Sequence, residues 1–243
     1  MAFDKNKFFD DILENIINNK IPNIDLHLHT NWTDGIHSVK EMHDEAIKKN
    51  CSHILFSEHS RKNSGNWFND FSSEVSKLSK NQCFSIIGTE VKVLDFDGNI
   101  DLNGRIQELS DLIMVSVHRF PGEVDSIKGE DGNLKKNNFK FEDDAIKIEY
   151  DLMCAAIDNP ITDIIGHPFG MSIKRFKRKP KDTLFEEIIK KCNIKNKTFE
   201  INSRYHYNYQ WLLKTCKKYN VRISLGSNAH KKEEIGEIYN LIK

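Results

Sequence analysis

The stretch NIDLHLHTNWTDG, residues 23–35, carries the first evidence for both the fold and the chemistry of this chain. Residues 24–28 form a short, mostly apolar run, which predicts a buried β-strand. Successive side chains of a strand point to opposite faces, so His27 and His29 lie on one side and can bind one metal ion together. Asp34 lies in the loop just beyond. The stretch therefore predicts a strand that delivers metal-binding side chains at its end.

The same unit recurs along the chain, where short apolar runs are each followed by a polar tip and then by a helical pattern. We predict further strands at 53–56, 84–87, 112–117, 161–165, 198–201 and 222–225. We predict helices at 4–19, from an N-cap at Ser38 with Glu41 three residues later to about 49, and at 70–78, 142–157, 183–192, 208–218 and 232–242. Asp97-Gly98 indicates a hairpin within 91–101, and residues 120–140 and 170–182 are predicted to be long loops.

This alternation predicts parallel strands joined by helical crossovers. An α/β barrel of βα units fits the length and the number of strands, as a single domain over residues 1–243. A doubly wound open sheet is the alternative, but no GxGxxG or GxxxxGK[ST] loop follows any predicted strand.

Composition narrows the classes of partner. The chain has 243 residues, with 36 Lys+Arg and 36 Asp+Glu, so gross charge gives no reason to expect DNA or an anionic membrane. No run approaches the roughly 20 apolar residues that span a bilayer. The N-terminus MAFDKNKFFDDILENII does not resemble a signal peptide. Five scattered cysteines, with no CxxC pair, predict a reducing, cytoplasmic setting.

Nearly every predicted strand delivers a histidine or a carboxylate at its C-terminal end, which is the face where βα barrels build active sites. After the first strand these residues are Glu58, His59, Glu90, His118, His167, Glu200 and His230, accompanied by the amides Asn202 and Asn228. The remaining histidines occupy helix, strand-start or loop positions, and we interpret them as structural: His37, His43, His53 and His206.

The donor set is mostly imidazole with a few carboxylates, which suits Zn²⁺, Mn²⁺ or Fe²⁺ better than Mg²⁺ or Ca²⁺. It offers more donors than one ion can use, so we predict a cluster of two or three metal ions bridged by Glu90. Bridged ions generate hydroxide at neutral pH and stabilise the entering and leaving oxygens of a displacement at phosphorus.

Taken in order, the motifs HLHT, WTDG, SEH, GTE, SVH, GHP, EIN and GSNAH resemble those of the PHP (polymerase and histidinol phosphatase) family. The resemblance runs from about Ile21 to Lys243. The runs GTEVKVLDFDGNID and SDLIMVSVH are similar to stand-alone bacterial phosphatases of the family and to the PHP domain of X-family DNA polymerases. The resemblance to this family implies a distorted (β/α)7 TIM-like barrel that holds a trinuclear metal cluster.

The resemblance also implies an assignment of ligands. One metal would take His27, His29, Glu90 and Asn228, a second would take Glu90, His118 and His167, and the third would take Asp34, His59 and His230. Glu58, Glu200 and Asn202 would orient these ligands.

Two residues depart from the family pattern. The family motif ends Gly-Ser-Asp-Ala-His, and this chain has Asn228 at the Asp position. An amide oxygen can coordinate but brings no negative charge, so we expect weaker metal binding and a less well-oriented nucleophile at that site. Glu58 stands where Asp is usual and keeps the carboxylate.

The sequence favours a metal-dependent phosphomonoesterase that acts on a small phosphorylated metabolite, as histidinol phosphatases do. We expect Arg119 and Arg204, and less directly Arg61, to clamp the phosphate, because a planar guanidinium matches phosphate oxygens bidentately. A nuclease is the runner-up, favoured by the basic residues within 174–181 and by the aromatics Tyr205, Tyr207, Tyr209 and Trp211. The third hypothesis, suggested by Asn228, is a family member that binds ligand or metal without catalysis. The sequence does not set the oligomeric state.

Overall fold

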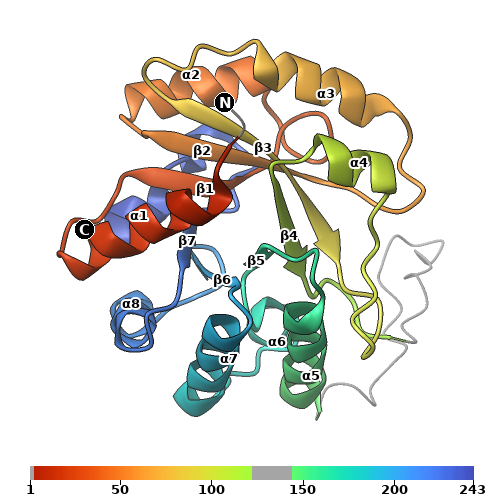
Figure 1. Ribbon diagram of the computed structural model, residues 1–243, viewed down its shortest axis with the longest axis vertical. Helices are drawn as coiled ribbons and strands as arrows, with labels where there is room; N and C mark the ends of the chain where they lie inside the picture. The colour runs from red at the N-terminus through yellow and green to blue at the C-terminus, as the bar shows by residue number, and fades with distance from the viewer. Residues whose placement is uncertain (1–2, 122–143) are drawn as a thin grey trace.

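The computed structural model describes residues 3–121 and 144–243 of the chain. Its centre is a seven-stranded parallel sheet whose strands follow one another in chain order, as Figure 1 shows. The strands are β1 (Ile24–Leu28), β2 (His53–His59), β3 (Phe84–Lys92), β4 (Leu112–Ser116), β5 (Ile164–Ile165), β6 (Thr198–Asn202) and β7 (Ile223–Gly226).

The first and last strands meet and bring the sheet close to a closed barrel. Leu28 forms a parallel bridge with Ala229. The backbone N–H of His29 donates to the Ala229 carbonyl at 2.9 Å, and the Ala229 N–H donates to the His27 carbonyl at 3.1 Å. The predicted distorted (β/α)7 barrel is therefore confirmed, and the doubly wound alternative is wrong because the strand order never reverses.

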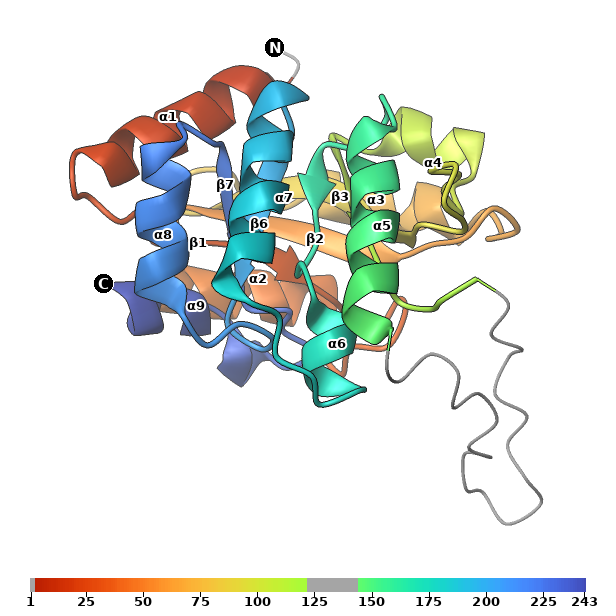
Figure 2. The same ribbon diagram turned by 90° about the horizontal axis from the view of Figure 1, so that it is seen from below.

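Helices surround the sheet. They are α1 (Lys5–Ile17), α2 (Val39–Lys48), α3 (Trp67–Ser76), α4 (Gly104–Leu109), α5 (Ala145–Asp158), α6 (Gly170–Lys174), α7 (Asp182–Ile194), α8 (Tyr209–Lys218), the 3-10 helix η2 (Lys232–Glu234) and α9 (Glu237–Ile242). Helices α5, α7 and α8 stand side by side on the outside of the barrel (Figure 2). Among the described helices, none is both long enough and apolar enough to cross a bilayer.

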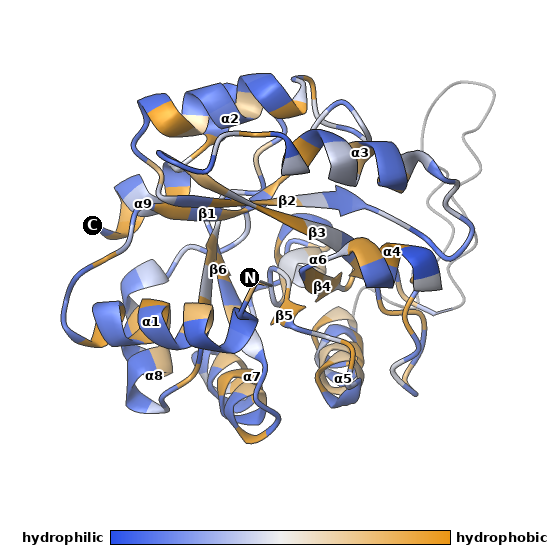
Figure 3. Ribbon diagram, turned by 45° about the horizontal axis from the view of Figure 1, so that its top comes forward, coloured by the Kyte–Doolittle hydropathy of each residue, from blue (hydrophilic) through white to orange (hydrophobic). Residues whose placement is uncertain are grey.

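The core fills the barrel and the layer between strands and helices. Every residue of β1, β4 and β6 is buried, as parallel strands covered on both faces require. Figure 3 shows hydrophobic residues along the strands and mixed colours on the helices, which present one apolar face inward. The predicted capping box opens α2, because the Glu41 N–H donates to Ser38 Oγ at 3.3 Å and the Ser38 N–H donates to Glu41 Oε2 at 2.9 Å.

Some elements differ from the sequence prediction. The stretch 170–182 was predicted to be loop throughout, but α6 occupies its first residues, held by a buried carboxylate from another helix. Helix α4 was not predicted, and β5 is only two residues long. The helix predicted at 232–242 is two elements, because Gly236 between them adopts a left-handed φ of 73°.

Two further predictions concern the stretches on either side of β4. The predicted turn at Asp97-Gly98 is confirmed by an antiparallel bridge between Val93 and Ile100, with Gly98 at a φ of 80°. Most of the loop predicted at 120–140, and the start of the helix predicted at 142–157, lie outside the described residues.

Candidate metal centre

The histidines and acids singled out in the sequence gather at one rim of the barrel. Parallel strands end at the same edge, so their C-terminal residues converge there. The donors come from the ends of β1, β2 and β3, from the segments after β4, β5 and β7, and from the loop after β1: His27, His29, Asp34, His59, Glu90, His118, His167 and His230.

Glu90 lies at the middle of this group and is 1% exposed. Its Oε1 is 2.8 Å from His167 Nε2 and 3.2 Å from His118 Nε2. Its Oε2 is 3.2 Å from His59 Nδ1 and 3.4 Å from His27 Nε2. The two oxygens thus face two different sets of imidazoles, which is the arrangement that a bridging carboxylate requires.

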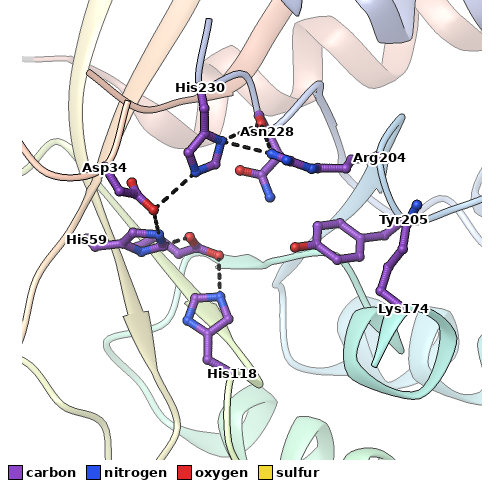
Figure 4. A pocket seen from close by; sticks show the side chains of 9 residues that line it. Asp34, His59, His118, Lys174, Arg204, Tyr205, Asn228 and His230 are labelled. Carbon is purple, nitrogen blue, oxygen red and sulfur yellow. Dashed lines mark hydrogen bonds and ion pairs between the residues drawn. The ribbon is translucent and has the colours of Figure 1, made fainter. Parts of the chain in front are cut away.

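A second group of donors adjoins the first. His29, Asp34, His59 and His230 each offer an atom within 4.8 Å of the others. Asp34 Oδ2 is 3.2 Å from His230 Nε2 and 3.5 Å from His59 Nε2. The ring of His59 therefore stands between the two carboxylates, with Nδ1 toward Glu90 and Nε2 toward Asp34. Figure 4 shows Asp34, His59 and His230 at one side of a pocket.

The spacing of the donor atoms fits a shell around a cation. Four ligands placed tetrahedrally at the Zn–N distance of about 2.0–2.1 Å lie roughly 3.3 Å from one another. His27 Nε2 is 3.1 Å from His29 Nε2, and His118 Nε2 is 3.4 Å from His167 Nε2. Two ring nitrogens that turn their lone pairs toward each other at this distance repel unless a proton or a cation lies between them.

Several buried polar atoms of the described residues lack a hydrogen-bond partner, which also indicates a cation site. Within the described parts of the chain, His29 Nδ1, Glu90 Oε2 and Asn228 Oδ1 are buried without a hydrogen-bond partner. Buried polar atoms in folded proteins are nearly always satisfied. Imidazole, carboxylate and amide groups left in this state fit divalent ions of the Zn²⁺, Mn²⁺ or Fe²⁺ type.

Glu200 and Asn202 lie behind the cluster. Glu200 Oε1 is 2.8 Å from His27 Nδ1 and accepts from Asn202 Nδ2 at 2.8 Å, while its Oε2 accepts from the backbone N–H of His167. Glu200 therefore fixes the ring of His27 so that Nε2 faces the cluster.

Glu58 holds the loop that carries Asp34. It accepts from the Thr30 N–H at 2.7 Å and from the Thr33 hydroxyl. Burial raises the pKa of Glu58 to about 7 despite these hydrogen bonds. Its side chain thus supports the loop that carries Asp34.

Asn228 lies at the rim between Arg204 and His230, and its side chain is buried. The backbone carbonyl oxygen of Asn228 is 2.9 Å from His230 Nδ1 and accepts from Arg204 Nη1 at 3.2 Å. When His230 Nδ1–H donates to this carbonyl, His230 Nε2 is left with its lone pair toward Asp34.

The pocket beside the cluster has a volume of about 400 Å³. Its described lining is Asp34, His59, Glu90, His118, Lys174, Arg204, Tyr205, Asn228 and His230. Of the three arginines singled out in the sequence, Arg204 lines this pocket. Arg119 and Arg61 are not among the lining residues, and Arg61 is exposed.

Several contributors were not identified from the sequence. Ser116 Oγ donates to Glu90 Oε1 at 2.6 Å, and Asp25 accepts from the backbone N–H groups of Ser227 at 2.9 Å and Gly236 at 2.8 Å. The strand alternation that places His27 and His29 on one side also places Asp25 there, so this residue could have been found. Lys174 and Tyr205 belong to the basic stretch and to the aromatics singled out in the sequence, and the structure adds that both line the pocket.

The other histidines form ordinary structural contacts. His206 Nδ1 accepts from the Asn202 N–H and its Nε2 donates to the Pro168 carbonyl, both at 3.0 Å, and burial lowers the pKa of His206 to about 4. His43 Nε2 is 3.1 Å from the Ser79 carbonyl.

Comparison with known proteins finds a family model and relatives that this chain resembles. Residues 25–204 match the model of the PHP domain family. A probable phosphatase of Caldicellulosiruptor bescii is 25% identical over 218 residues, which cover 88% of this chain and 82% of that protein. The DNA polymerase/3′-5′ exonuclease PolX of Bacillus subtilis is 23% identical over 225 residues, which cover 88% of this chain but 35% of that protein.

Solved structures share the fold. Histidinol phosphate phosphatase of Lactococcus lactis, in a complex with Zn, L-histidinol and phosphate, aligns with a TM-score of 0.60 and 19% identity over 90% of this chain and 92% of that one. The putative histidinol phosphatase of Listeria monocytogenes aligns with a TM-score of 0.70 and 16% identity over 89% of this chain and 98% of that one.

Proposed function

The chain belongs to the PHP domain family, and from this premise we propose that it hydrolyses phosphomonoesters of small metabolites with a cluster of two or three divalent ions. The observation that supports the proposal most directly is Glu90, whose two oxygens face two sets of imidazoles. The relatives named as probable phosphatases, and the zinc-bound histidinol phosphate phosphatase of similar fold, favour the same chemistry.

We take the ligand sets that the family resemblance implies, and the neighbours at the rim support them. His27, His29 and Glu90 would hold one ion together with the amide oxygen of Asn228. Glu90, His118 and His167 would hold a second, and Asp34, His59 and His230 a third. His59 can serve either of two ions, because its ring nitrogens face Glu90 and Asp34.

Ions held there would make water nucleophilic at neutral pH and neutralise charge on the phosphate oxygens. The protein would supply orientation. Arg204 lies beside His230 and is held by the Asn228 carbonyl, so its guanidinium is placed to bind a phosphate oxygen at the edge of the cluster. Glu200 and Ser116 would keep His27 and Glu90 in their productive orientations.

A nuclease remains the second candidate because of the similarity to PolX. Of the basic residues in 174–181, Lys174 is in the described lining of the pocket, and of the four aromatics only Tyr205 lies there. A single-strand groove needs several stacking platforms and a longer basic track, so the described lining favours a small substrate.

The proposal is tested with purified, metal-quantified protein assayed on a panel of phosphomonoesters and on single-stranded DNA and RNA, beside the Asn228→Asp variant. Hydrolysis of monoesters alone supports the phosphatase. Shortened oligonucleotides would support the nuclease, and activity that appears only in Asn228→Asp would support a non-catalytic native protein.

A further inference from the structure

The wall of the pocket away from the metal cluster is built from Arg204, Tyr205 and Lys174. Figure 4 shows His59 and His118 on one side and these three residues on the other, with the Tyr205 hydroxyl directed toward the cluster and Lys174 beyond its ring. For a phosphomonoester whose phosphate lies at the cluster, this wall is the part of the described lining that faces the leaving group across the pocket.

The short helix that carries Lys174 is anchored by a buried contact. Lys174 is the last residue of α6, and the first turn of that helix is anchored to α5 by Glu149, which is 1% exposed. Glu149 Oε1 accepts from the Met171 N–H at 3.0 Å, and Oε2 accepts from the Ser172 N–H at 2.6 Å. The backbone that carries Lys174 is therefore fixed, although the side chain is exposed to solvent.

Tyr205 completes the wall as a neutral donor. Its ring packs on His167, with 4.4 Å between the ring centroids and 32° between the planes. Its hydroxyl points toward the cluster, so it can donate a hydrogen bond to a ligand in the pocket (Figure 4).

The charges of this wall do not suit a cationic leaving group. Among the described lining residues, the carboxylates are Asp34 and Glu90, and both belong to the cluster. Within residues 3–121 and 144–243, no carboxylate forms an ion pair with Lys174. A leaving group that carries an ammonium would meet Lys174, whereas one that carries a second anion would pair with it.

We propose that Lys174 selects phosphomonoesters whose leaving group carries a second anionic group, a carboxylate or another phosphate, over those with a neutral or cationic leaving group. This inference rests on the proposed phosphatase function and adds the charge class of the substrate.

Three esters on the same two-carbon frame test the proposal: 2-phosphoglycolate, 2-hydroxyethyl phosphate and O-phosphoethanolamine, which carry a carboxylate, a hydroxyl and an ammonium. The bisphosphate of ethane-1,2-diol adds a second phosphate and so separates the two anionic sources. We expect kcat/KM to rank anionic above neutral above cationic. In Lys174→Met we expect about a tenfold loss for the anionic esters, mainly in KM, with little change for the neutral one.

Lys181→Met is the matched control, because Lys181 belongs to the same basic stretch and is absent from the described lining. An equal loss on all esters in Lys174→Met would overturn the proposal, since Lys174 would then bind the common phosphate. Equal rates on the three esters in the native protein would overturn it as well.

Inert phosphonates separate this inference from the proposed function. Binding of 3-phosphonopropionate, 3-hydroxypropylphosphonate and 3-aminopropylphosphonate to the metal-loaded protein, measured by calorimetry, reports the charge preference without turnover. Tighter binding of 3-phosphonopropionate that Lys174→Met abolishes supports the inference even if no ester is hydrolysed, and equal binding of all three contradicts it. Absence of hydrolysis on every ester would contradict only the phosphatase.

Discussion

Asn228 determines the charge at one position of the candidate metal centre. It places a neutral amide where the family motif carries a carboxylate, and its oxygen is buried without a partner among the described residues. Its backbone adopts a φ of 54°, a left-handed conformation that Asn and Asp both tolerate better than most residues. Exchange of the amide for a carboxylate therefore changes the charge of the site without a backbone conflict.

We expect Asn228→Asp to bind one metal ion more tightly, on the order of tenfold, because a full negative charge then faces the cation. Competition with a chromophoric chelator measures the affinity ion by ion. Asn240→Asp, the same exchange on α9, serves as the control. Unchanged affinities in Asn228→Asp would show that residue 228 does not contact a metal.

Removal of the charge of Glu90 is the converse test, because this charge faces both sets of imidazoles. We expect Glu90→Gln to lose most of its bound metal, with an affinity more than about tenfold lower, and to lose turnover with it. Elemental analysis after dialysis measures the metal content, with the exposed Glu108→Gln on α4 as control. Native metal content in Glu90→Gln would contradict the bridging role.

At the scale of the element, α6 depends on a residue far from it in sequence. Burial raises the pKa of Glu149 to about 7 from its ordinary 4.5, so the folded state holds a proton that the unfolded state has already lost. When the folded pKa of an acid is raised, the stability is highest at low pH and falls as the pH rises from about 4.5 to about 7.

We therefore expect Glu149→Gln to remove this decline, which amounts to at most about 3 kcal/mol. The variant also loses one carboxylate oxygen that accepts from the backbone of α6, so it starts from a lower stability. Urea unfolding of metal-loaded protein between pH 4.5 and 7.5 measures both effects. Parallel pH curves for the native protein and the variant would show that Glu149 titrates normally.

The elements also show what the sequence could and could not predict. His59, Glu90 and His167 were identified because each follows a local pattern, an apolar run that ends in a donor. Ser116 gains its role from packing against Glu90 of a neighbouring strand, which no local pattern records. The same reason explains α6, whose stretch is rich in basic residues and was predicted to be loop.

At the scale of the whole molecule, the ions would act as crosslinks among strands that are far apart in sequence. Any ion that binds only the folded state stabilises it by mass action, by about 4 kcal/mol when it is present at a thousand times its dissociation constant. For a chain of this length that corresponds to roughly 10 °C in Tm.

We accordingly expect chelation to lower the thermal midpoint by about that amount, and Zn²⁺ or Mn²⁺ to restore it where Mg²⁺ does not. Differential scanning calorimetry of the chelated and reconstituted protein measures the shift. Glu90→Gln should unfold at the same temperature with and without chelator. If chelation left the thermal midpoint of the native protein unchanged, this would contradict a metal cluster bound by the residues at the barrel rim.

The junction of β1 with the segment after β7 has a consequence for biosynthesis. His27 and His29 leave the ribosome about 200 residues before Asn228 and His230. A nascent chain that still lacks the segment after β7 exposes a partial set of donors and an unpaired edge on its first strand. We therefore expect metal to load only after this segment has been translated, and a chain truncated before it to be an apo-protein prone to aggregate.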